Sequence, residues 1–137
     1  MLRRSVLAAA PLLPALAACQ SPSGGEAQAR QRALPVVFFT DESAAMGPEA
    51  RAVIAGAAER ARARPGVPVA VRGFTAPDSA ASPAFSRALA EARAQNVADA
   101  LVAGGVPRDR IRVQPRGPVP FEIMPVESRR VEIHVGG

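Results

Sequence analysis

The chain contains no tryptophan, no tyrosine and no lysine, and it has only one cysteine and one histidine. A single cysteine, Cys19, cannot form an internal disulfide bond. A zinc site built from cysteine and histidine needs at least three such ligands, which Cys19 and His134 cannot supply. We therefore expect no metal and no cofactor, and we interpret His134 as a surface or half-buried residue of a strand.

The basic residues are all arginines, seventeen in number against twelve acidic residues. Two of them, Arg3 and Arg4, lie in an N-terminal segment that we expect to be removed, so the remaining fifteen exceed the acids by three. Nucleic-acid-binding proteins cluster their basic residues beside stacking aromatic side chains. Here acids interleave the arginines and the aromatic residues are five phenylalanines. Nucleic-acid binding is therefore not expected.

The sequence also lacks a recognisable catalytic set. A serine nucleophile would need His134 as its base, yet nothing around Ser79, Ser82 or Ser86 resembles a nucleophile elbow. We therefore expect a binding protein and not an enzyme.

The N-terminus has the pattern of a secretory signal, with a basic pair, an apolar run and small residues in that order. The apolar run from Val6 to Ala15 is shorter than the roughly 20 residues that cross a membrane, and Pro11 and Pro14 interrupt it. We predict a signal peptide at residues 1–18, with a short membrane anchor as the alternative.

Residues 16–19, Leu-Ala-Ala-Cys, resemble the lipobox of bacterial lipoproteins. This resemblance implies that Cys19 is acylated and becomes the first residue of the mature chain. Gln20 in place of aspartate implies sorting to the outer membrane. Residues 19–33 are rich in Ser, Gly, Gln and Ala, so we interpret them as a flexible tether whose average span is roughly 20 Å. The rest of the chain, residues 34–137, is predicted to be one domain.

Hydrophobic periodicity predicts strands and helices in alternation through this domain. The run 34–39 reads as a strand buried on both faces, and Pro48 is suited to open a helix that Pro65 and Gly66 end. The further predicted elements are a strand at 67–74, a helix at about 84–102 and strands at 110–114 and 129–135, the last two separated by an irregular proline-rich segment. The order strand, helix, strand, helix, strand, strand predicts an α/β fold, a two-layer α+β sandwich with both helices on one face of a mixed sheet.

Several motifs resemble the OmpA-like C-terminal domain family, which includes the Pal lipoproteins. The central one begins with a strand exit and loop and continues on a helix: Gly73, Phe74, Thr75, Asp78, Leu89, Ala90, Arg93, Ala94, Val97 and Leu101. Further matches open and close the domain: Phe38, Phe39, Ser43, Met46, Pro48, Glu49, Ala50, Gly105, Val106, Pro107, Arg110, Ile111, Arg129, Arg130, Val131, Glu132 and Ile133. Together they cover about three quarters of the chain.

The resemblance implies an outer-membrane lipoprotein that is anchored through Cys19 and whose periplasmic domain binds peptidoglycan without a covalent bond. In this family the ligand is the diaminopimelate of the stem peptide. Asp78 would pair with its ammonium group, and Arg93 would bind its carboxylate, for which a guanidinium is better suited than a lysine. Thr75, Ser86 and Arg129 would complete the peptidoglycan site.

The sequence departs from the family pattern beside this site. Ala76 and Pro77 stand between Thr75 and Asp78, where the family has threonine directly followed by aspartate. Asp78 is therefore open to a second interpretation, as a turn or cap residue. Arg93 has an alternative interpretation as a residue on a solvated helix face. Arg129 has one as an ordinary arginine of an edge strand. On those readings the chain is a degenerate OmpA-like domain, a structural module or one that binds envelope protein partners in place of the cell wall.

Overall fold

The computed structural model describes residue 25, residues 33–77 and residues 82–136. Its elements are β1 (Val36–Phe38), α2 (Pro48–Ala63), β2 (Val69–Thr75), α3 (Pro83–Ala103), the 3-10 turn η1 (Arg108–Arg110), β3 (Ile111–Pro118), the 3-10 turn η2 (Pro125–Glu127) and β4 (Arg130–Val135). The predicted order of strands and helices is confirmed.

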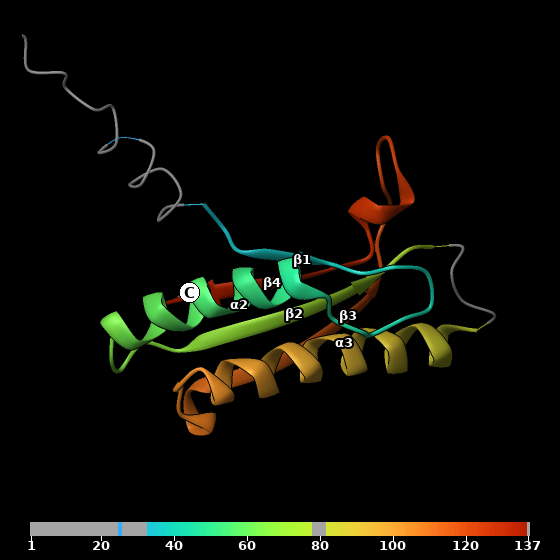
Figure 1. Ribbon diagram of the computed structural model, residues 1–137. Coiled ribbons are helices and arrows are strands. Elements are labelled where there is room, and N and C mark those ends of the chain that lie inside the picture. Colours follow the sequence, from blue (N-terminus) through green and yellow to red (C-terminus); the bar gives the residue numbers. More distant parts are fainter. Residues whose placement is uncertain (1–24, 26–32, 78–81, 137) are drawn as a thin grey trace, which may run out of the picture.

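The four strands form one mixed sheet in the order β1-β4-β2-β3. β4 pairs antiparallel with both β1 and β2, whereas β2 and β3 are parallel and are joined through α3. The two helices lie along the same face of this sheet (Figure 1). The fold is thus the two-layer α/β arrangement that the sequence predicts.

The core lies between the helices and the inward-facing strand residues. Alternation along the strands directs Val69, Val71, Val131 and Ile133 toward the helices, where they are fully buried. Alanines make up three of the four buried residues of α2 and three of the eight buried residues of α3, so the helices approach the strands closely. Gly73 shows how closely, because a Cβ atom placed there would lie 2.1 Å from the carbonyl oxygen of Ala90.

Both helices begin and end where the local sequence favours it. Pro48 occupies the first turn of α2, and Gly66 beyond its end adopts a left-handed φ of 86°. α3 is capped by Ser82, whose Oγ accepts a hydrogen bond of 3.2 Å from the backbone N–H of Phe85. No helix within the described residues is both long enough and apolar enough to cross a membrane.

Two details of the predicted strands are wrong. The first strand is not buried on both faces, because both helices cover the same face of the sheet and Phe38, on the other face, is 54% exposed. β3 continues past Gln114 to Pro118 although it contains Pro115 and Gly117. β3 lies at an edge of the sheet, where a proline without an N–H is tolerated, and a register shift between Gly73 and Phe74 accommodates the extra residue.

Candidate functional site

Arg93 is a fully buried cation in the middle of α3. Its Nε donates to the carbonyl of Ser43 at 2.8 Å, its Nη1 to that of Phe74 at 3.1 Å and its Nη2 to that of Thr40 at 3.0 Å. One guanidinium therefore joins the loop after β1 to the end of β2. The alternative that Arg93 lies on a solvated helix face is wrong.

The surroundings of Arg93 disfavour its charge. Burial and, after it, the positive charge of Arg129 lower the pKa of Arg93 to about 10, whereas the carboxylate of Asp41 acts in the opposite direction. The guanidinium also lies 5.3 Å from the centre of the Phe39 ring, within the range of a cation–π contact. Two positive charges in one buried region create a local potential that favours an anion.

Arg129, the second predicted guanidinium, lies at the same end of the sheet, just before β4. Its Nε donates to the carbonyl of Phe39 at 3.2 Å, and its Nη1 forms an ion pair with the exposed carboxylate of Asp41. β4 is an inner strand of the sheet, so the interpretation of Arg129 as an edge-strand residue is wrong.

Polar side chains without partners lie near these two arginines. Thr75, the last residue of β2, and Ser128, which precedes Arg129, are fully buried, and neither hydroxyl has a hydrogen-bond partner. Ser86 is also buried and faces inward from the first turns of α3. Buried hydroxyls without partners are uncommon in folded proteins and call for an explanation.

The predicted acid, Asp78, lies outside the described residues. The structure therefore does not show whether its carboxylate meets the arginines, and its pairing with a ligand stays a prediction. Ala76, which would take the acid's place if the chain had no insertion after Thr75, is fully buried. Alanine has no carboxylate, so an acid that pairs with the ligand near Thr75 must come from another residue.

The sequence did not reveal the part played by the loop between β1 and α2. This loop supplies two of the carbonyls that bind Arg93, and a third, that of Ala44, accepts a hydrogen bond of 2.9 Å from the Asn96 side chain. Backbone carbonyls carry no sequence signature, so only Asp41 and Asn96 could have been noticed. The loop is thus fixed to α3 at three points.

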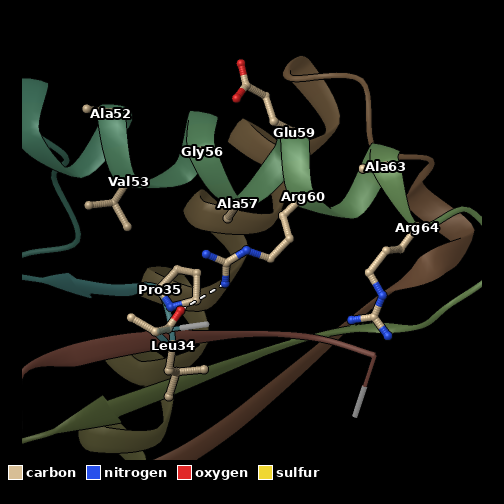
Figure 2. A pocket seen from close by; sticks show the side chains of 11 residues that line it. Leu34, Pro35, Ala52, Val53, Gly56, Ala57, Glu59, Arg60, Ala63 and Arg64 are labelled. Atoms are coloured by element: carbon tan, nitrogen blue, oxygen red, sulfur yellow. Dashed lines mark hydrogen bonds between the residues drawn. The ribbon is translucent and has the colours of Figure 1, made fainter. Parts of the chain in front are cut away.

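A groove of about 1100 Å³ lies elsewhere, between α2 and the chain that enters β1. Its lining is mostly apolar and includes none of the predicted site residues. The groove is lined by Ala33, Leu34, Pro35, Ala52, Val53, Gly56, Ala57, Glu59, Arg60, Ala63 and Arg64 (Figure 2). The guanidinium of Arg60 crosses it to the carbonyl of Ala33 at 2.9 Å. The groove is therefore not the predicted site.

Groups of three or more metal-ligating side chains are not found among the residues that the structure describes. The described side chains of the site are two arginines, the carboxylate of Asp41, hydroxyl groups and a phenylalanine ring. Their chemistry suits a small anionic or zwitterionic ligand that is recognised by guanidinium groups and backbone polar atoms.

Several solved structures have a similar fold. The crystal structure of the peptidoglycan-associated lipoprotein from Burkholderia pseudomallei has a TM-score of 0.67 and 20% identity, covering 74% of this chain and 89% of that one. The C-terminal domain of Helicobacter pylori MotB has a TM-score of 0.66 and 25% identity, covering 75% and 85%. The OmpA-like domain of FopA1 from Francisella tularensis has a TM-score of 0.62 and 20% identity, covering 72% and 68%.

Among curated proteins, no relative matches this chain. The sequence model of the OmpA family matches residues 38–121, which run from β1 through β3 and contain Thr75, Ser86 and Arg93. This match spans more than half of the chain, which therefore belongs to the OmpA family.

Proposed function

We propose that this protein is an outer-membrane lipoprotein whose domain binds peptidoglycan through the diaminopimelate of the stem peptide. The observation that carries the proposal is the pair of guanidinium groups, Arg93 and Arg129, at the end of the sheet where β2 and the loop after β1 meet. The name of a structural neighbour, the peptidoglycan-associated lipoprotein, supports the same ligand.

The two arginines have different roles in this proposal. Arg129 is partly exposed and can meet a ligand carboxylate directly, in exchange for or beside Asp41. Arg93 is fully buried, and its three hydrogen bonds use three of the five N–H groups of a guanidinium. It fixes the loop after β1 to the end of β2, and its remaining donors would become available to a ligand only if this loop moved away.

Asp78 completes the proposed site as the partner of the ligand ammonium. A carboxylate and guanidinium groups together suit an amino acid end that carries both charges. Thr75 and Ser86 would supply hydroxyl groups from the buried side. We propose a binding role for these groups and assign them no catalytic step.

Sedimentation with purified sacculi tests this function. A chain that begins at Gln20 retains every residue of the core, which extends from Val37 to Ile133, and it lacks the acylation site. We expect this chain to pellet with sacculi and Asp78→Asn to lose most of the bound fraction. Asp109→Asn is the matched control, because Asp109 is an exposed acid on η1, far along the chain from the site.

Two outcomes of this experiment would contradict parts of the proposal. If the wild-type chain stays in the supernatant, the peptidoglycan proposal is wrong. If it pellets and Asp78→Asn pellets equally, binding stands but the acid is misassigned. The proposed anchor has its own test, labelling of the native protein with palmitate, which should be abolished by Cys19→Ser.

One observation favours a protein partner as the second candidate function. The segment between β3 and β4 exposes Ile123 and Met124, at 81% and 58%. The carboxylate of Glu127 accepts backbone hydrogen bonds from Glu122, Ile123 and Met124, so the apolar tip is held in place. A fixed apolar tip can contact an envelope protein. Crosslinking from position 123 in intact cells would detect such a partner.

A further inference from the structure

The face of the sheet opposite the helices carries the positive charge of the strands. Within the described residues both helices pack on the other face (Figure 1). The strands contain four arginines, which are Arg72, Arg112, Arg116 and Arg130, and a single acidic residue, Glu132. We call this side of the sheet the open face.

Side-chain contacts place these arginines on one surface. Nε of Arg72 donates to Oε1 of Gln114 at 3.1 Å, and Nη2 of Arg116 donates to the same oxygen at 3.3 Å. Arg112 precedes Gln114 by two residues on β3, and alternation therefore directs it to the same side. Arg112 and Arg116 are both exposed to solvent.

β4, which pairs with β2 on the side away from β3, adds one acid and one histidine to the open face. Glu132 is shared between Nε of Arg130 at 2.9 Å and Nε2 of His134 at 3.0 Å. Because Glu132 is already paired with Arg130, it does not neutralise the exposed guanidinium groups of β3. The surplus charge of the open face is therefore positive and faces solvent along β3.

Aromatic residues accompany these charges. The guanidinium of Arg130 lies 4.5 Å from the centre of the Phe74 ring. At the edge of the sheet, Phe38 of β1 is opposite Arg130 and is 54% exposed. An exposed phenylalanine beside a row of arginines is a composition suited to a membrane interface, where rings enter the headgroup region and guanidinium groups bind phosphates.

We propose that the open face docks on the headgroups of anionic phospholipids. This inference rests on the proposed lipid anchor, because Cys19 lies only fourteen residues before Ala33, where the described domain begins. Even fully stretched, such a segment spans at most about 50 Å. It enters the domain at β1, the edge strand that carries Phe38, and so keeps the open face within reach of the membrane that holds the anchor.

Flotation with lipid vesicles tests this proposal on a chain that begins at Gln20 and has no acyl group. We expect it to float with phosphatidylglycerol vesicles and not with phosphatidylcholine vesicles, and to be released by salt. Arg112→Glu with Arg116→Glu should weaken binding at least about 25-fold, since each basic residue near such a surface contributes roughly fivefold.

The matched control is Arg51→Glu with Arg87→Glu. These two arginines are exposed on α2 and α3, and their reversal changes the net charge by the same amount. We expect the control to retain most of the vesicle binding, and both double variants to pellet with sacculi as the wild type does. The sacculus assay thus separates failure of this inference from failure of the peptidoglycan proposal.

Three results would overturn the inference. One is the absence of wild-type binding to phosphatidylglycerol vesicles. Another is an equal loss in both double variants, which would show that total charge and not the open face determines binding. The third is loss of sacculus binding in Arg112→Glu with Arg116→Glu while the control variant still pellets, which would make the open face a cell-wall surface.

Discussion

Nη2 of Arg93 donates a hydrogen bond of 3.0 Å to the carbonyl of Thr40, a residue 53 positions earlier in the chain. Nε of the same guanidinium binds Ser43. A helix residue thus determines the position of the loop that leaves β1. In this member of the family, Arg93 fixes the conformation of the loop beside the site and also contributes positive charge to it.

Replacement of Arg93 by lysine should destabilise the domain. An ammonium group is a compact donor that cannot reach carbonyls of two separate segments in the planar geometry of a guanidinium. Leaving buried carbonyls without a donor costs about 2 kcal/mol in the free energy of unfolding. Urea denaturation measures this change. Arg87→Lys, at an exposed position of the same helix, should stay within about 0.5 kcal/mol of the wild type, and equal stability of the two variants would contradict the role of Arg93.

Gly73→Ala should be among the more damaging small substitutions in the chain. Its Cβ would lie 2.1 Å from the carbonyl oxygen of Ala90 and 3.2 Å from the Cβ of Ala94, so α3 would have to move from β2. We expect a loss of about 3 kcal/mol. Gly56→Ala is the opposite case, because nothing lies within 4 Å of its Cβ position in α2, and helix propensity predicts a gain of about 0.5 kcal/mol or more. Thermal denaturation of both variants checks this contrast.

Lowering the pH should reduce the contribution of Glu132 to the stability of the domain. Burial alone would raise the pKa of this carboxyl, but hydrogen bonds from His134 and Arg130 outweigh it and hold the pKa below its ordinary value of 4.5. A carboxyl whose pKa is lower in the folded than in the unfolded protein stabilises the fold at pH values above its unfolded pKa. This stabilisation is lost as the pH falls through the folded pKa. Glu132→Gln should therefore cost about 1 kcal/mol at neutral pH, and the difference from the wild type should shrink below about pH 4.5. A difference that does not change with pH would count against the ion pair. Arg72 is the opposite residue on β2 and also faces this carboxyl.

Glu127→Gln should loosen the segment between β3 and β4. Both carboxylate oxygens accept backbone N–H groups there, at 3.0 Å from Glu122 and 3.1 Å from Met124, and the first of these bonds is the main cause of the lowered pKa of Glu127. A glutamine offers only one acceptor oxygen. Hydrogen exchange should accelerate about tenfold at these amides and remain unchanged at Val113 in β3. Unchanged exchange at Glu122 and Met124 would show that the carboxylate does not fix the tip.

The arrangement of elements could be predicted because local signals and the core pattern agree. Pro48 opens α2 as expected, and α3 extends one residue beyond the predicted range at each end. The burial of β1 was misjudged because the run Val36–Phe38 is apolar on both sides, and the sequence alone does not say that one face of the sheet stays uncovered. Edge position explains why Pro115 did not end β3.

The candidate site was predictable only in part. The family pattern indicated Arg93 and Arg129, and the structure places both at one end of the sheet. The three carbonyls that bind Arg93 could not be predicted, because they depend on how the loop after β1 meets the end of β2 and not on side-chain identity. The charge of the open face could not be predicted either, since Arg72, Arg112 and Arg130 lie on three different strands and share one face only through strand pairing.

The central claim is that the end of the sheet near Arg93 and Arg129 binds the diaminopimelate end of a stem peptide. Amide chemical shifts measured during titration with a diaminopimelate-containing stem peptide test it most directly. We predict saturable changes concentrated at Thr75, Ser86 and Arg129, and none at Arg112 on the open face. The absence of saturable changes, or changes centred on Arg112, would contradict the account.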